Sequence, residues 1–218
     1  MSSKNPHSKI ITKKAREMLL PLGVKQKGRS RLWIGDEKWY VILVEFQPSK
    51  ARKGTYLDLG ITWLWYPKSY FSYDVGGKQG QFVEYKSDEQ FLQSFTSLTK
   101  DVPHKINNIK NSLSTMQGAY QYASTSNNLG KDEGWLNLNL GVLAILAGKR
   151  KTGVDLLKSV ESKEVKTSWQ EERRIFCETL ISKSQNLDEL KLWIEEQIIL
   201  SREMKKISVG AKLELPKN

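Results

Sequence analysis

The sequence holds little of the side-chain chemistry that metalloenzymes and covalent enzymes use. Its 218 residues include one Cys and two His. One cysteine cannot close an internal disulfide, and two histidines cannot build a histidine-rich metal site. We therefore expect no metal and no cofactor, and the reducing cytoplasm fits this cysteine content.

Long apolar runs are also missing. The longest uninterrupted ones, residues 39–44 and 142–147, span six residues each, whereas a helix needs about 20 to cross a bilayer. No apolar segment follows the first residues, so we expect no secretory signal. These absences predict a cytoplasmic protein that has no membrane partner.

The composition that remains suits a globular protein. Hydrophobic residues make up 39% of the chain and aromatic residues 10%, which is enough for an ordinary core and excludes disordered, collagen-like and coiled-coil proteins. The length is that of one large domain or two small ones.

The positive charge gathers at one end of the chain. Residues 1–31 carry nine Lys or Arg and one acid, a net charge of +8, whereas the other 187 residues have a net charge of +3. Such a cluster can bind phosphate groups or an acidic partner. It can also be a solvated helix face beside a guarded edge strand, and the sequence leaves both interpretations open.

The N-terminal part of the chain changes from helical to strand periodicity. Apolar residues at helical spacing over residues 10–22 predict a helix with one buried face, ended by Gly23. Alternating patterns then predict five strands, at residues 25–34, 39–47, 54–66, 69–75 and 81–85. Short connections that contain Gly35, or Gly76 and Gly77, predict hairpins and hence an antiparallel sheet. In the first strand four cations alternate, which predicts an outer position: Lys25, Lys27, Arg29 and Arg31.

Beyond residue 86 the sequence is helical. Ser87, with Gln90 three residues later, predicts a capped helix start, and Pro103 can occupy the first turn of a second helix. Four more helices are predicted at residues 135–147, 153–160, 167–181 and 187–207. The pair around Gly148 resembles the helical hairpin of a tetratricopeptide unit, without a second copy at a fixed period.

These patterns together predict an α+β protein with flanking helices on a five-stranded antiparallel sheet and an all-helical C-terminal half. We expect a sheet domain over residues 1–123, a polar linker or exposed loop over 124–134, and a helical subdomain with a hairpin over 135–218.

Three stretches of the N-terminal half together resemble a known family. They are residues 19–29 (LLPLGVKQKGR), 47–50 (QPSK) and 56–60 (YLDLG). Their order and spacing are similar to an uncharacterised bacterial family of unknown function, the 4304 family, over about residues 9–115. Asp58 stands where that family has Asn. The resemblance implies a bacterial source and an α+β fold, and it implies no activity.

Motifs of common enzymes are missing from the sequence. It contains no Walker-type phosphate loop, no Gly-x-Ser-x-Gly elbow and no His-Glu-x-x-His helix. The glycine-rich residues 76–80 lack the following helix of a phosphate loop, and Cys177 lies in an amphipathic stretch typical of a buried thiol. Glu45 and Asp58 lie within apolar strands, where a buried carboxylate can serve as an acid or base, although a neighbouring cation satisfies such a group more often. We therefore predict no catalytic residue.

Aromatic residues concentrate in the predicted sheet. Thirteen of the 21 Phe, Trp and Tyr residues lie between Trp33 and Tyr85. One face of the third predicted strand carries Tyr56, Asp58 and Tyr66, which can form a concave binding surface unless helices cover it.

The sequence thus leaves three functions open. The first is a non-enzymatic module that binds a protein partner through the aromatic sheet face or the helical hairpin. The second is a nucleic-acid-binding protein in which Lys25, Lys27, Arg29 and Arg31 contact phosphates and Trp33 stacks on a base. The third is a hydrolase that uses Glu45 or Asp58. Oligomeric state cannot be read from the sequence.

Overall fold

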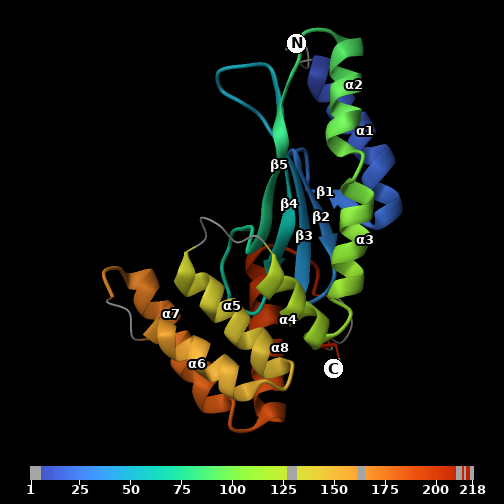
Figure 1. The fold of residues 1–218 in the computed structure, drawn as a ribbon. Coiled ribbons are helices and arrows are strands. Elements are labelled where there is room, and N and C mark those ends of the chain that lie inside the picture. The colour runs from blue at the N-terminus through green and yellow to red at the C-terminus, as the bar shows by residue number, and fades with distance from the viewer. Residues whose placement is uncertain (1–5, 127–131, 162–164, 210–212, 214, 217–218) are drawn as a thin grey trace. The chain divides into compact units, whose positions relative to one another are not determined.

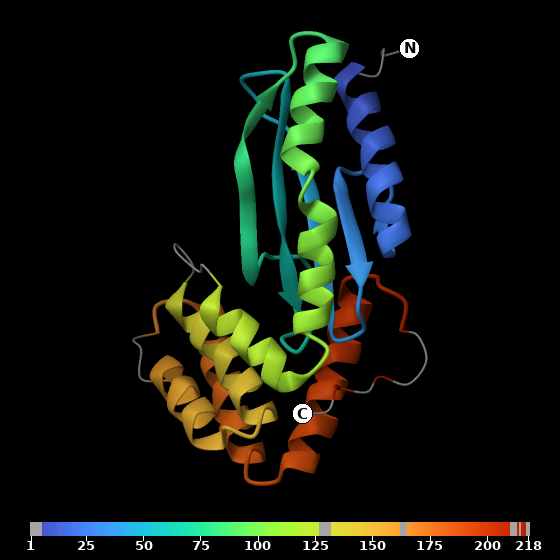
Figure 2. The same ribbon diagram turned by 45° about the vertical axis from the view of Figure 1, so that its right-hand side comes forward.

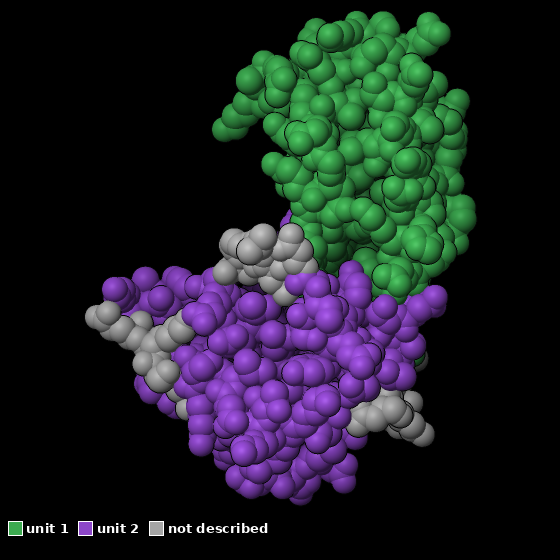
Figure 3. Space-filling view, viewed as in Figure 1, with its two compact units in different colours: residues 1–62, 75–110 green, residues 63–74, 111–218 purple. Residues whose placement is uncertain are grey.

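The computed structural model describes residues 6–126, 132–161, 165–209, 213 and 215–216. Its internal contacts divide the chain into two compact units, which Figure 3 colours separately. Unit 1 comprises residues 1–62 and 75–110, and unit 2 comprises residues 63–74 and 111–218. The connection between the last two strands therefore belongs to unit 2.

Unit 1 is an antiparallel sheet with helices on one side (Figures 1 and 2). The five strands follow one another in the order β1-β2-β3-β4-β5. They are β1 (Val24–Gln26), β2 (Leu32–Asp36), β3 (Tyr40–Gln47), β4 (Gly54–Trp63) and β5 (Val75–Glu84). The helices are α1 (Pro6–Leu19), the 3-10 turn η1 (Leu20–Leu22), α2 (Asp88–Thr99) and α3 (Val102–Ser112). The predicted α+β class with a five-stranded antiparallel sheet is confirmed.

The centre of the sheet is buried on both faces. In β3 every residue from Tyr40 to Val44 is buried, as its apolar run predicted. The helix side of the sheet is aromatic, with the Phe46 ring 5.2 Å from the ring of Phe95 on α2. Trp33 pairs with Val44 across β2 and β3 and is 1% exposed. The sheet aromatics on this side thus serve as packing.

Two of the predicted strands are wrong. Residues 25–34 do not form one strand, because β1 ends at Gln26 and a turn around Gly28 (φ +59°) leads into β2. Residues 69–75 precede β5 and contain no strand apart from Val75.

The predicted hairpin turn at Gly76 and Gly77 is also wrong, since both residues lie inside β5 and pair with Gly60 and Leu59. A Cβ atom on Gly76 would lie 2.5 Å from the Leu59 carbonyl oxygen. Glycine is therefore required here by close approach of two strands.

Unit 2 is helical and includes the segment of residues 63–74. Its helices are α4 (Met116–Thr125), α5 (Glu133–Leu146), α6 (Arg150–Glu161), α7 (Ser168–Lys183) and α8 (Leu187–Met204). Helices α5 and α6 form the predicted hairpin around Gly148, and they meet where Gly141 faces Gly153. A Cβ atom on Gly153 would lie 2.6 Å from the Gly141 carbonyl oxygen, so the small residues allow the two backbones to approach.

Side-chain caps begin the helices where the sequence predicted them. Ser87 accepts a hydrogen bond from the Gln90 amide, while the Gln90 side chain accepts one from the Lys86 amide. Asn186 caps α8 by accepting from the amides of Asp188 and Glu189. Of the predicted linker, residues 127–131 lie outside the described residues, and the parts on either side belong to α4 and α5.

Candidate functional site

The four predicted cations occupy different kinds of position in unit 1. Lys25 is exposed on β1, and Lys27 and Arg29 lie in the β1–β2 turn. Arg31 is half-buried just before β2, where its carbonyl oxygen accepts a hydrogen bond from the Phe46 amide. The cations therefore do not form one stripe along one strand face.

Local hydrogen bonds explain why the turn forms within an alternating sequence. The Ser30 hydroxyl donates to the Lys27 carbonyl at 2.7 Å, and the Gln26 side-chain amide donates to the Ser30 carbonyl at 2.7 Å. Serine side chains commonly satisfy turn backbones in this way. The turn brings Arg29 and Arg31 beside α1.

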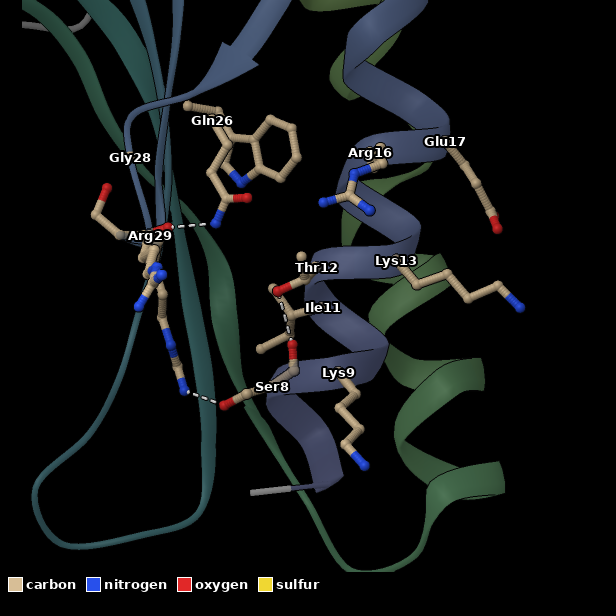
Figure 4. A pocket seen from close by; sticks show the side chains of 13 residues that line it. Ser8, Lys9, Ile11, Thr12, Lys13, Arg16, Glu17, Gln26, Gly28 and Arg29 are labelled. Carbon is tan, nitrogen blue, oxygen red and sulfur yellow. Dashed lines mark hydrogen bonds between the residues drawn. The ribbon is translucent and has the colours of Figure 1, made fainter. Parts of the chain in front are cut away.

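A groove lies between α1 and the β1–β2 turn (Figure 4). Its volume is about 780 Å³. Five of its lining residues are cations: Lys9, Lys13, Arg16, Arg29 and Arg31. Its one carboxylate, Glu17, pairs with Lys14 at 2.9 Å. In Figure 4, Arg16 points from α1 toward Gln26, whereas Lys13 and Glu17 point away from the turn.

The other predicted binding residues do not extend this groove. Trp33 lines it but is buried, so its ring cannot stack on a base. Tyr56 is half-buried, with its ring 4.8 Å from that of Phe82 and the Lys78 ammonium 4.5 Å above it. Asp58 is 6% exposed and pairs in register with Lys78.

Tyr66 lies in unit 2, beyond the end of β4. Its ring packs edge-on against Trp135 at 4.7 Å and against Phe176 at 4.9 Å. Burial, followed by the charge of Glu172, raises the pKa of Tyr66 to about 12. The predicted surface of Tyr56, Asp58 and Tyr66 is therefore divided between the two units.

Comparison of the chain with protein-family models, curated proteins and solved structures gives no match. The resemblance to the 4304 family stays a prediction. Across the described residues, no cluster of three or more His, Cys, Asp or Glu side chains is arranged to hold a metal ion. None of the described helices combines the length and the apolarity that crossing a bilayer requires.

A second, smaller pocket in unit 1 lies beside the groove. It has a volume of about 220 Å³ and is formed by His7, Arg31 and the β3–β4 loop of residues 48–54. Arg31 lines both the pocket and the groove. No local sequence pattern indicates this pocket, because His7 and Arg31 are 24 residues apart and the loop follows a different strand.

Unit 2 holds cations of a different kind. The Lys68 ammonium, in the segment before β5, bonds the Asp74 carboxylate at 3.1 Å and lies 5.4 Å from the Trp135 ring. Arg173 on α7 is 4% exposed and bonds Asp132 at 2.5 Å. A cavity of about 140 Å³ borders both carboxylates. Each of these buried cations therefore already has a carboxylate partner.

The carboxylates and the thiol considered for catalysis are not assembled into a reacting group. Glu45 is half-buried and accepts a hydrogen bond from the Gln47 side chain at 3.2 Å. Cys177 is fully buried on α7 in unit 2, whereas His104 is exposed on α3 in unit 1. The described residues that were considered for catalysis therefore do not lie together.

Proposed function

We propose that unit 1 is a non-enzymatic binding module that holds an acidic protein partner in the basic groove between α1 and the β1–β2 turn. The charge of the groove carries this proposal. Five cations line it, and its one carboxylate is bound by Lys14. A surface of one sign attracts a partner of the opposite sign and speeds its association.

The lining residues favour a protein partner over a single-stranded nucleic acid. Proteins that bind single strands stack successive bases on exposed aromatic rings. Trp33 is the one aromatic residue that lines the groove, and it is 1% exposed. Ile11, which also lines the groove, is 2% exposed, so the cations and polar side chains of the groove would carry the recognition of an acidic segment.

Fluorescence anisotropy of a short labelled peptide rich in Glu and Leu tests the proposal. Replacing Arg16 and Arg29 together by Ser should weaken binding about tenfold, because each exposed charge contact is worth about 0.5–1 kcal/mol and 1.4 kcal/mol is a factor of ten. The matched control replaces Lys86 and Lys100, exposed cations of unit 1 outside the groove, by Ser. The control should bind the peptide as the wild type does.

The same experiment with a single-stranded oligonucleotide of equal charge separates the two partner classes. We expect the peptide to bind more tightly at equal salt. Tighter binding of the oligonucleotide, weakened by the same Arg16 and Arg29 changes, would instead support the nucleic-acid function. Equal losses of peptide affinity in the groove variant and the control variant would show that the groove does not bind the peptide.

A further inference from the structure

In the described part of unit 1, two hydrogen-bond donors are buried without an acceptor. The Arg31 Nη2 atom donates to the Ser8 hydroxyl at 2.8 Å and lies 3.4 Å from His7 Nε2. Arg31 Nη1 and His7 Nδ1 are also buried, and neither has a hydrogen-bond partner among the described residues. Buried polar atoms are nearly always satisfied in folded proteins, so two unsatisfied atoms on neighbouring side chains point to an absent partner.

The contact between the two side chains fixes what that partner must be. A guanidinium group can only donate hydrogen bonds, so His7 Nε2 must accept, and the hydrogen of a neutral ring then sits on Nδ1. Burial, followed by the charges of Arg31 and Lys53, lowers the pKa of His7, which keeps the ring neutral at neutral pH. Both unsatisfied atoms are therefore N–H donors, and the absent partner is an acceptor.

The pocket around these donors is positively charged. Besides His7 and Arg31 it is lined by the loop residues Pro48, Ser49, Lys50, Ala51, Arg52, Lys53 and Gly54. Three of the loop residues are cations, and no carboxylate lines the pocket. The Ser49 hydroxyl accepts hydrogen bonds from the amides of Ala51 and Arg52, which folds the loop over the pocket. His7 lies in the first turn of α1, where the helix dipole also favours an anion.

We propose that this pocket binds a tetrahedral oxyanion, namely phosphate or the phosphate group of a small phosphomonoester. Arg31 Nη1 and His7 Nδ1 donate to its oxygens, and Lys53 neutralises its second charge. The pocket volume of about 220 Å³ accommodates such an ion. Both nitrogens are shielded from solvent in the structure, so side chains around them must move before the anion can contact them.

This inference does not rest on the proposed acidic partner. Lys53 and His7 line the small pocket and are not part of the groove, whereas Arg16 and Arg29 line only the groove. Variants of the two pairs of residues therefore separate phosphate binding from peptide binding.

Isothermal titration calorimetry of the full chain with inorganic phosphate at pH 7.5 tests the proposal. His7→Phe keeps an aromatic ring against Tyr85 and Phe91 but removes the Nδ1 donor. Lys53→Ser changes an exposed side chain and should not disturb folding. Each variant should bind phosphate about tenfold more weakly, the loss expected for one charge-assisted hydrogen bond. The control Lys100→Ser and the Arg16 and Arg29 double variant should bind as the wild type does.

Two results would overturn the proposal. One is a wild-type protein that takes up no phosphate at millimolar concentration, and the other is a Lys53→Ser variant, with its fold intact, whose phosphate affinity equals that of the control. A titration with O-phosphoserine distinguishes the source of the anion, because a phosphomonoester site binds it at least as well as inorganic phosphate. Weaker binding of O-phosphoserine assigns the pocket to the free ion.

Discussion

The two units differ in their net charge and in the partners of their buried cations. Unit 1 contains 18 Lys or Arg and nine Asp or Glu, a net charge of +9, whereas unit 2 contains 17 and 15, a net charge of +2. In unit 2 the buried cations Lys68 and Arg173 each bond a carboxylate. In unit 1 the Arg31 guanidinium contacts the Ser8 hydroxyl and the His7 imidazole instead of a carboxylate. Its Nη1 atom is buried without a hydrogen-bond partner among the described residues, as is the Nε atom of Arg173, so the units differ in the carboxylate partner of the cation.

This difference separates cations that hold the fold from cations that are available to a ligand. A buried charge needs an opposite charge or several hydrogen bonds to be tolerated. The Lys68–Asp74 pair of unit 2 meets this need. One Asp74 carboxylate oxygen accepts a hydrogen bond from the Lys68 ammonium, and the other accepts one from the Trp63 amide. Among the described residues of unit 1, Arg31 Nη1 and His7 Nδ1 have no hydrogen-bond partner, and an incoming anion would supply one.

The largest expected effect comes from breaking a pair in unit 2. Asp74→Ala leaves the Lys68 ammonium and the Trp63 amide without this acceptor, and the Lys68 and Asp74 side chains are only 10% and 8% exposed. We expect a loss of about 3–5 kcal/mol in the free energy of unfolding, measured by urea denaturation. Asp155→Ala, at an exposed position of α6, is the control and should change stability by less than about 0.5 kcal/mol. Equal effects of the two changes would mean that the Lys68–Asp74 pair does not hold unit 2 together.

Acidification should weaken unit 1 through His7. Because the folded-state pKa of His7 lies below 6.5, the unfolded chain takes up the proton first, and stability falls as the pH drops below about 6.5. His7 faces Arg31, Lys53, Tyr85 and Phe91, none of which is an acid that would favour the charged ring. For one proton, the free energy of unfolding falls by at most about 1.4 kcal/mol per pH unit. Urea denaturation at several pH values should give a shallower slope between pH 6.5 and 5 for His7→Phe than for the wild type.

Asp132 in unit 2 provides the contrast in pH dependence. Burial raises its pKa, but hydrogen bonds from the Trp135 amide and Arg173 outweigh burial and lower the pKa below 3.8. Its contribution to stability is present above that pH and is lost only in stronger acid. If urea denaturation shows that the free energy of unfolding of the wild type is constant from pH 6.5 down to pH 4, the lowered pKa of His7 is contradicted.

The smallest effect is expected where a cation has no carboxylate partner. Arg31→Met keeps the apolar stem of the side chain and removes the unsatisfied Nη1 atom together with the bond to Ser8. Removing the unsatisfied atom should stabilise the fold about as much as losing the Ser8 hydrogen bond destabilises it. The free energy of unfolding should therefore change by less than about 1 kcal/mol. A loss in urea denaturation as large as that of Asp74→Ala would show that Arg31 is a structural cation, and the contrast between the units would disappear.

The fold could be predicted from the sequence wherever a single pattern, such as apolar periodicity or a helix cap, described the segment. Helical stripes and the Ser87 and Asn186 caps located α1 to α3 and α5 to α8, and the apolar run of residues 39–44 located the central strand. Helix α4 (Met116–Thr125) was not predicted. The prediction was wrong where strand-like alternation and residues typical of turns occurred in the same segment. The alternation of residues 25–34 suggested one strand, but Gly28 and Ser30 formed a turn within it. At Gly76 and Gly77 the glycines reflected close strand packing and not a hairpin.

The candidate site was predictable only in its charge. The cluster of cations in residues 1–31 was compatible with a surface for phosphate or an acidic partner and with a solvated face, and two of the predicted cations, Arg29 and Arg31, line the groove. Trp33, which the nucleic-acid alternative expected to stack on a base, is 1% exposed, and a strand pattern does not say which face the helices cover. The pairing of His7 with Arg31, and the approach of Lys53 to both, depends on how α1 and the β3–β4 loop pack against the sheet. No local pattern encodes that contact.

The most direct test of the contrast between the units is an NMR titration of the isotopically labelled full chain with the acidic peptide and, separately, with phosphate. We expect the peptide to shift amide signals of α1 and the β1–β2 turn, and phosphate to shift those of His7 and residues 48–54. Signals around Lys68 and Arg173 should stay in place. Shifts concentrated around Lys68 and Arg173 would contradict this expectation, because they would mean that the cations of unit 2, which already bond carboxylates, receive the ligand in place of those of unit 1.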